Sequence, residues 1–332
     1  VSGWLGWTIL EKEIRDRYND DILQEAMRRF GIAEGEIKLL DGFESFMYEY
    51  GRDFILRVGH SRRRTPDLIR GEVDWINYLA AGGASVARAI ESQSGALVEE
   101  IPDSYGSRFL ATAFVKARGG PAWKNGGWSE DLIDRYGRLL GRIHALSKGY
   151  KVANEAWRRP SWDDPLNVRL APLEPPIAEK LEEVISYLQA LPQDGDSYGM
   201  IHQDAHEGNF FVDEQGQITL FDFDDCCYGH FVYDLAMVLF YTVTNLADAA
   251  QFAPYFWERF MRGYAAENSL DPAWQREIPH FMKLREIDLY AIILRDYDSL
   301  EGDEWVEGYL NGRRERIVEG LPYGEFRMSD LV

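Results

Sequence analysis

One polar stretch stands out from the apolar segments around it: Ile201-His202-Gln203-Asp204-Ala205-His206-Glu207-Gly208-Asn209. It places an aspartate and an asparagine five residues apart, directly before a run with the composition of a strand. An aspartate on a loop can accept the proton of a hydroxyl group, and an asparagine beyond it can offer an oxygen to magnesium. Asp204 and Asn209 are therefore candidates for a general base and a metal ligand.

A second acidic segment follows thirteen residues after Asn209. The apolar run 218–221 ends in Asp222, and Asp224 and Asp225 come directly behind it. Residues 209–212 and 218–221 predict a strand pair around the turn at 213–216. A strand that ends in Asp222 would place that carboxylate opposite Asn209. Two hard oxygen ligands on facing strands suit magnesium, which takes its remaining ligands from water and phosphate oxygens.

Simpler interpretations exist for these residues. A single aspartate is more often a turn former or a strand-end cap than a functional group. His202 and His206 also have the four-residue spacing of zinc ligands on a helix, and could join Asp204 in a zinc site. Gly208 and the strand behind it argue against a helix here, and no third soft ligand is evident. Magnesium is therefore favoured over zinc.

The charge balance narrows the range of partners. The 332-residue chain has 36 Lys and Arg against 56 Asp and Glu, a formal net charge of -20. Such a surface repels nucleic acid and anionic lipid, and it favours a cationic substrate. Adjacent cysteines, Cys226 and Cys227, rarely bridge. The first ten residues do not resemble a signal peptide, and no apolar run is long enough to span a bilayer, so we expect a cytoplasmic protein.

Hydrophobic periodicity predicts two parts that differ in architecture. Residues 11–30 have the spacing of one amphipathic helix. Short apolar runs at 37–40, 45–50 and 54–58 predict three antiparallel strands, followed by a helix over 68–79 and strands at 96–100 and 109–115. Beyond a boundary at 116–121, long helical patterns dominate: 129–146, 177–191, 233–244, 254–266, 273–297 and 305–319. We expect parts 1–116 and 117–332.

These motifs resemble the catalytic loop and metal-binding strand of the aminoglycoside phosphotransferase and choline kinase superfamily, which shares the protein-kinase fold. The resemblance covers most of the chain, and the matching residues are His202, Asp204, His206, Asn209, Asp222, Gly229 and Asp234-Leu235. It implies an ATP- and Mg²⁺-dependent kinase with an α+β, two-lobed fold: a small lobe with an antiparallel sheet of about five strands, and a larger, mainly helical lobe.

The resemblance also assigns roles in the second lobe. It implies that Asp204 is the catalytic base and that Asn209 and Asp222 hold magnesium. Asp224 would support a second metal position or the acceptor. Asp234 would hydrogen-bond the catalytic loop, and His202 would brace that loop, with His206 as a further supporting residue.

The amino-terminal half fits the same family. Ser45 lies in the hairpin that stands where the family's phosphate-covering loop lies. The position of the family's phosphate-contacting lysine is held by Arg57, and Glu72 is its matching helical partner. An arginine at this position can still pair with phosphate and with a carboxylate, through a planar guanidinium group instead of the point charge of lysine. Backbone groups near Ala113 and Val115 would contact the adenine edge. His144, on the helix before the catalytic loop, has the pattern of a core histidine.

The acceptor is a hydroxyl compound whose identity stays open: an aminoglycoside, choline, an amino alcohol or a homoserine-like molecule. A carboxy-terminal helix carries polar residues that could contact the acceptor: Glu286, Asp288, Tyr290, Arg295, Asp296 and Asp298. A solvated helix face is the default interpretation of each charge, but acidic groups among them would suit an amine-bearing acceptor. Trp123, Trp128 and Trp162 could also line the acceptor site, and core packing explains them equally well.

Two further classes of function remain as alternatives. The segment 222–226 also resembles homoserine-kinase-like enzymes and bacterial stress-response serine/threonine kinases, so a protein could be the acceptor. A pseudokinase that binds nucleotide without turnover is the third hypothesis, because arginine replaces the usual lysine. The sequence specifies neither an oligomeric state nor a preference for ATP over GTP.

Overall fold

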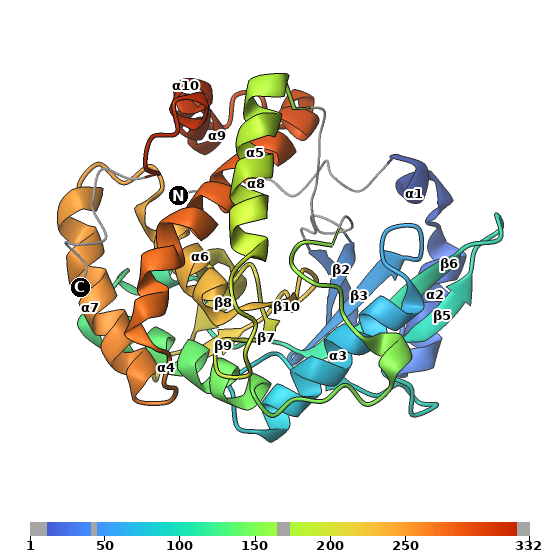
Figure 1. Ribbon diagram of the computed structural model, residues 1–332. Coiled ribbons are helices and arrows are strands. Elements are labelled where there is room, and N and C mark those ends of the chain that lie inside the picture. The colour runs from blue at the N-terminus through green and yellow to red at the C-terminus, as the bar shows by residue number, and fades with distance from the viewer. Residues whose placement is uncertain (1–11, 41–44, 165–172, 324–332) are drawn as a thin grey trace. The chain divides into compact units, whose positions relative to one another are not determined.

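The computed structural model describes residues 12–40, 45–164 and 173–323 (Figure 1). The chain divides into two compact units. The first unit consists of the residues up to Arg118 together with Lys151–Arg159, and the second consists of Gly119–Tyr150 and the residues from Pro160 onward. The segment Lys151–Arg159 thus belongs with the first unit, although it follows residue 117 in sequence.

The first unit is built on an antiparallel sheet. Its strands run in the order β1 (Ile37–Leu40), β2 (Phe46–Tyr50), β3 (Phe54–His60), β6 (Arg108–Val115) and β4 (Ala89–Ile90), and β5 (Glu99–Pro102) pairs with β6 as well. The sheet has six strands rather than about five, because the two-residue strand β4 is too short to give a sequence pattern. Leu56, Val58, Ala111 and Ala113 pack fully buried in its core.

The amino-terminal helix differs from the prediction. Instead of one helix over 11–30, the described residues form α1 (Lys12–Arg17) and α2 (Asp20–Phe30). The break occurs because Asn19 caps α2: its side chain accepts a hydrogen bond from the Ile22 N–H at 3.1 Å. Tyr18, at the break, stacks on Phe46 with ring centroids 3.7 Å apart, so the chain turns where an aromatic side chain enters the core.

Helix α3 (Pro66–Ala81) is held at its capped start and along its length. Thr65 accepts a hydrogen bond from the Leu68 N–H at 3.2 Å, and Pro66 occupies the first turn. The 3₁₀ turn η2 (Glu155–Trp157) lies so close to α3 that a Cβ at Gly71 would be 2.0 Å from the Trp157 carbonyl oxygen. This close approach explains why Lys151–Arg159 belongs to the first unit.

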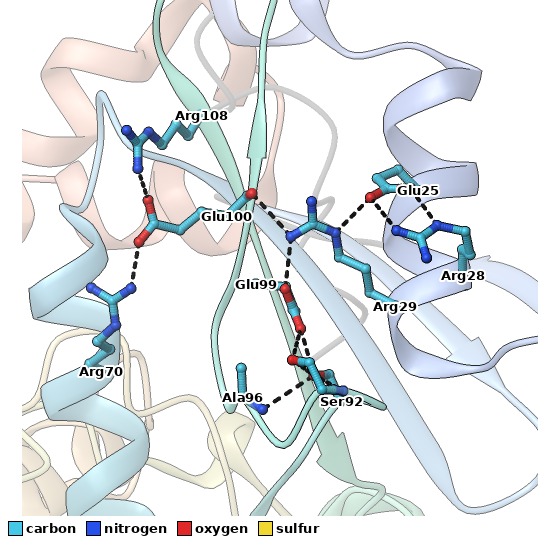
Figure 2. A network of polar contacts seen from close by, with 10 residues as sticks. Glu25, Arg28, Arg29, Arg70, Ser92, Ala96, Glu99, Glu100 and Arg108 are labelled. Carbon is cyan, nitrogen blue, oxygen red and sulfur yellow. Dashed lines mark hydrogen bonds and ion pairs between the residues drawn. The ribbon is translucent and has the colours of Figure 1, made fainter.

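A network of ion pairs ties both helices to β5 (Figure 2). Arg29 of α2 donates to Glu99 at 2.7 Å and to the Glu100 carbonyl at 3.1 Å. Arg70 of α3 and Arg108 of β6 both bind the Glu100 carboxylate. Because Glu99 and Glu100 are neighbours that point to opposite faces of the strand, β5 connects α2 with α3.

The second unit is mainly helical. Its helices are α4 (Glu130–Ser147), α5 (Pro175–Gln189), α6 (Phe231–Val243), α7 (Ala249–Ala265), α8 (Ile278–Leu300), α9 (Glu304–Leu310) and α10 (Arg313–Val318), with 3₁₀ turns η1 (Ala122–Asn125), η3 (Glu207–Asn209) and η4 (Pro272–Glu277). The single helix predicted for 305–319 is two short helices, and 273–297 begins as the turn η4. Nowhere in the described ranges is a helix both long and apolar enough to span a membrane.

Two small antiparallel ribbons complete this unit. The predicted strand pair is confirmed as β8 (Phe210–Val212) with β9 (Ile218–Leu220). The other ribbon, β7 (Tyr198–Ile201) with β10 (Cys227–His230), was not predicted. Since β7 ends at Ile201 and β8 begins at Phe210, the polar stretch 202–209 is the loop between the two ribbons.

Helices α4 and α7 pack at backbone contact. A Cβ at Gly137 of α4 would lie 2.0 Å from the Phe260 carbonyl oxygen, and a Cβ at Gly263 of α7 would lie 2.1 Å from the Asp134 carbonyl oxygen. Both distances are far shorter than any real Cβ contact, so only glycine permits this approach.

We predict that Gly263→Ala destabilises the protein, although alanine favours helices over glycine by about 1 kcal/mol. Separating α4 from α7 should lower the free energy of unfolding by about 3 kcal/mol, or roughly 6–12 °C in Tm. Gly195→Ala is the matched control, since a Cβ there has no atom within 4 Å. Thermal unfolding followed by circular dichroism measures both. Equal Tm values for the two variants would contradict the packing.

Candidate active site

The backbone of the loop 202–209 is held by one buried carboxylate. Asp234, on α6, accepts hydrogen bonds from the His202 N–H at 2.9 Å and the Gln203 N–H at 2.7 Å. Gln203 has a φ of 70°, a conformation that costs energy for a non-glycine residue and is kept where neighbouring contacts impose it. The predicted hydrogen bonds from the loop to Asp234 are confirmed.

A buried histidine supports Asp234 from the other side. His144, on α4, has Nε2 3.0 Å from Asp234 Oδ2 and Nδ1 2.8 Å from the Tyr264 hydroxyl. This pattern fits a ring that donates from Nε2 to the carboxylate and accepts at Nδ1. His144 is fully buried, so its prediction as a core histidine with satisfied nitrogens is confirmed.

His202 braces the loop with both ring nitrogens. Its Nδ1 accepts from the Asp204 N–H at 3.3 Å, and its Nε2 donates to the Phe221 carbonyl at 3.1 Å. Burial lowers the pKa of His202, which keeps the ring neutral. Residues 202–206 do not form a helix, so the helical spacing that suggested zinc is not realised.

The Asp204 carboxylate points toward three donors. Its Oδ1 accepts from Arg285 Nη2 at 2.7 Å, and its Oδ2 accepts from Asn209 Nδ2 at 3.2 Å and lies 3.4 Å from His206 Nε2. Burial raises the pKa of Asp204, but the nearby His206 and Arg285 outweigh this and hold the pKa well below its usual range. Asp204 is therefore ionised at neutral pH and can accept a hydrogen bond from a hydroxyl group.

Asn209 and Asp222 come together through the β8–β9 ribbon. The Phe221 N–H donates to the Asn209 carbonyl at 2.9 Å, so Asp222 follows directly after the residue bonded to Asn209. Asp222 is exposed and has a φ of 65°, again in the left-handed region. The amide nitrogen of Asn209 is used by Asp204, which leaves its Oδ1 as the atom suited to a hard cation.

These two oxygen donors fit magnesium better than a metal held by protein ligands alone. Among the described residues, no group of three His, Cys, Asp or Glu side chains could hold a metal ion. Magnesium in phosphotransfer sites needs only one or two protein ligands, because phosphates and water supply the others. Asp224 lies partly exposed two residues beyond Asp222.

The first unit contains the predicted Arg57–Glu72 ion pair. Arg57 of β3 donates from Nη1 and Nη2 to the two carboxylate oxygens of Glu72 on α3, each at 2.8 Å, and from Nε to the Thr112 hydroxyl at 3.2 Å. Glu72 is only 1% exposed. A bidentate pair at this depth fixes α3 against the sheet.

The remaining residues predicted for nucleotide binding lie on the same sheet or directly beside it. Ser45 precedes β2, and its hydroxyl oxygen would be 3.3 Å from a Cβ at Gly59. Residues 41–44 of the predicted loop lie outside the described residues. Ala113 stands opposite Leu56 and Ile90 within the sheet, and the Val115 N–H already donates to the Arg88 carbonyl at 2.9 Å.

A family model described as the phosphotransferase enzyme family matches residues 37–277, which include both the Arg57–Glu72 pair and the loop 202–209. The chain belongs to this family. It is therefore a phosphotransferase that acts on a hydroxyl group of a small molecule.

Individual relatives agree with the family. An amicoumacin kinase of Bacillus subtilis is 36% identical over 335 residues, which cover 97% of this chain and 99% of the relative. A solved amicoumacin kinase, in complex with AMP-PNP, Ca²⁺ and Ami, has a TM-score of 0.90 at 32% identity, with 97% of this chain and 100% of the other covered. A microcompartment-associated aminopropanol kinase has a TM-score of 0.70 at 21% identity, covering 92% and 100%, and shares the fold.

The solved relatives confirm the predicted kinase-like fold of this phosphotransferase, with an antiparallel sheet in one lobe and helices in the other. On α8, the prediction that Glu286 lies on a solvated helix face is wrong. Glu286 is fully buried, and its two carboxylate oxygens bind Arg313 at 2.7 Å and Lys283. The contact with Arg313 joins α8 to α10.

Other candidates for acceptor contacts are also placed. Asp288 pairs with Arg285 at 3.0 Å, Tyr290 is buried, and Arg295 is exposed. The side chains of Asp296 and Asp298 lie outside the described residues. Trp162 is buried against Phe281, Trp128 packs on Tyr136 and Phe256, and Trp123 is exposed; core packing thus explains two of the three tryptophans.

Sequence reasoning missed Arg285 and Tyr241, which both contact the Asp204 site. A signal for Arg285 exists in the helical spacing, since Phe281, Arg285 and Ile292 are buried and recur on one face of α8. An arginine within an apolar face needs a buried partner, and that expectation could have drawn attention to it.

We predict that Asp234→Asn destabilises this phosphotransferase. An amide places N–H groups toward at least one of the three donors that now meet the carboxylate, so the free energy of unfolding should fall by about 3 kcal/mol. Asp131→Asn on α4 removes an exposed charge paired with Arg135 and should change it by less than about 0.5 kcal/mol. Urea denaturation compares the variants. A stability of Asp234→Asn equal to that of the control would contradict this account of the loop.

Proposed function

We propose that this protein transfers the γ-phosphoryl group of Mg-ATP to a hydroxyl group of amicoumacin. The observation that carries the proposal is the match to the amicoumacin kinase of Bacillus subtilis at 36% identity along nearly the full length of both chains. The solved amicoumacin kinase that resembles this chain at a TM-score of 0.90 was captured with AMP-PNP, Ca²⁺ and Ami.

Asp204 acts as the base in this proposal. Its carboxylate is ionised and already takes part in directed hydrogen bonds, so it can orient the acceptor hydroxyl and receive its proton as the phosphoryl group arrives. The low pKa makes Asp204 a weak base. This agrees with a loose transition state, in which the proton moves late and positioning contributes more than proton abstraction.

Residues 1–116 would bind the nucleotide, and residues 117–332 would carry catalysis and the acceptor. Asn209 Oδ1 and Asp222 would hold magnesium, which when bound neutralises charge on the phosphate oxygens. Arg57, fixed by Glu72, would contact the phosphates, with Ser45 and the backbone near Ala113 and Val115 as further nucleotide contacts. Asp224 would lie near the second metal position or the acceptor, and His206 would support Asp204.

We predict that the purified protein with Mg²⁺ phosphorylates amicoumacin and that Asp204→Ala abolishes the transfer. ADP formation is measured across amicoumacin, aminopropanol, homoserine, choline, aminoglycosides and a generic protein substrate. Asp204→Ala should keep its affinity for Mg-ATP, whereas Asp222→Ala should bind Mg-ATP more weakly because a metal ligand is lost. Full activity of Asp204→Ala would contradict the mechanism.

The same panel tests the other functions. Turnover of another small hydroxyl compound without amicoumacin would keep the mechanism and change the substrate. Phosphate found only on protein would favour a serine/threonine protein kinase. Nucleotide binding with no turnover of any compound would favour a pseudokinase.

A further inference from the structure

A buried arginine reaches the Asp204 carboxylate from a distant helix. Arg285 of α8 is 8% exposed, and its Nη2 lies 2.7 Å from Asp204 Oδ1. Eighty-one residues separate the two in sequence. The contact therefore depends on how α8 packs against the rest of the second unit, and α8 packs directly on α6.

Two further groups fix the guanidinium of Arg285. Its Nη1 binds Asp288 Oδ2 at 3.0 Å, one turn along α8. Its Nε donates to the Tyr241 hydroxyl on α6 at 3.0 Å, and the Tyr241 ring lies 5.4 Å from the guanidinium carbon. Because its three nitrogens bind groups on the loop, α6 and α8, the planar guanidinium group of Arg285 is held in one orientation.

The hydrogen bonds that hold the loop backbone leave the Asp204 side chain free to rotate about its own bonds. Asp234 fixes the N–H groups of His202 and Gln203, which lie before Asp204. Asn209 holds Oδ2 at 3.2 Å, near the long end of the usual range. The shortest, charge-assisted contact to the carboxylate is that of Arg285, so it contributes most to the orientation of the oxygens.

We propose that Arg285 is a positioning residue for phosphoryl transfer: it holds the Asp204 carboxylate in the orientation that receives the acceptor hydroxyl, while Tyr241 and Asp288 hold Arg285. In the step it supports, the acceptor oxygen bonds to the γ-phosphorus, the bond from phosphorus to the ADP oxygen breaks, and the hydroxyl proton passes to Asp204. This inference rests on the role of Asp204 given under the proposed function.

The decisive measurement is steady-state kinetics of Arg285→Gln with Mg-ATP and amicoumacin, or whichever compound of the panel is turned over. We expect kcat to fall about 100-fold, the cost of a catalytic group displaced by about 1 Å. KM for both substrates should stay within about threefold. The kcat of Arg285→Lys should be about tenfold higher than that of Arg285→Gln, because lysine keeps the positive charge but lacks the planar guanidinium group. Arg276→Gln, at an exposed arginine in the turn η4 directly before this helix, is the matched control and should keep full activity.

Three results would overturn the inference. An unchanged kcat in Arg285→Gln would show that Asp204 needs no such support. A raised kcat would show that Arg285 blocks the base, and a loss confined to the acceptor KM would make it a binding residue instead. Asp204→Ala, measured in parallel, separates the two proposals: if it stays active, or if no compound is turned over, the proposed function fails and the inference fails with it.

Tyr241→Phe tests the role of Arg285 independently, even if Arg285→Gln folds poorly. It removes the hydroxyl that accepts from Arg285 and leaves the ring in place, so kcat should fall about 3–10-fold with little change in KM. In the Arg285→Lys background the same change should have less than half this effect on a logarithmic scale, because Tyr241 acts through Arg285. A full, additive effect of Tyr241→Phe in that background would contradict the coupling.

Discussion

The carboxylate of Asp234 is the contact on which the active-site loop depends. It accepts from two successive backbone N–H groups of the loop and from His144, and it is fully buried. A buried carboxylate is costly unless each oxygen is satisfied, and here charge-assisted hydrogen bonds provide that compensation. Because α6 and α4 both supply parts of this arrangement, the position of the loop is determined by the helical core.

The loop and the ribbon beside it are held in conformations that the backbone does not favour by itself. Gln203, directly before Asp204, has a positive φ. Asp222, which follows the β8–β9 ribbon, also has a positive φ. Such conformations persist where surrounding contacts over-determine them, and they are typical of functional sites. In the first unit, neighbouring contacts compensate the cost of a buried charge. The carboxylate of Glu72 is buried, and Arg57 pairs with both of its oxygens.

The β8–β9 ribbon was predicted from the local pattern of apolar residues and turn formers. The Arg57–Glu72 pair and the contacts of Asp234 were predicted from the resemblance to a known family. The sequence did not predict the break at Asn19, because helical periodicity continues across a cap. Nor did it predict the contact of Arg285 with Asp204 or the burial of Glu286. These depend on which faces of distant helices meet, and spacing within one helix does not carry that information.

The use of arginine on β3 also changes how this strand responds to covalent modification. Acetylation removes the positive charge of a lysine side chain. The strand Phe54–His60 contains no lysine, and Arg57 carries a guanidinium group that is always charged. Lysine acetylation therefore cannot switch off the Arg57–Glu72 ion pair. The charge at this position is permanent.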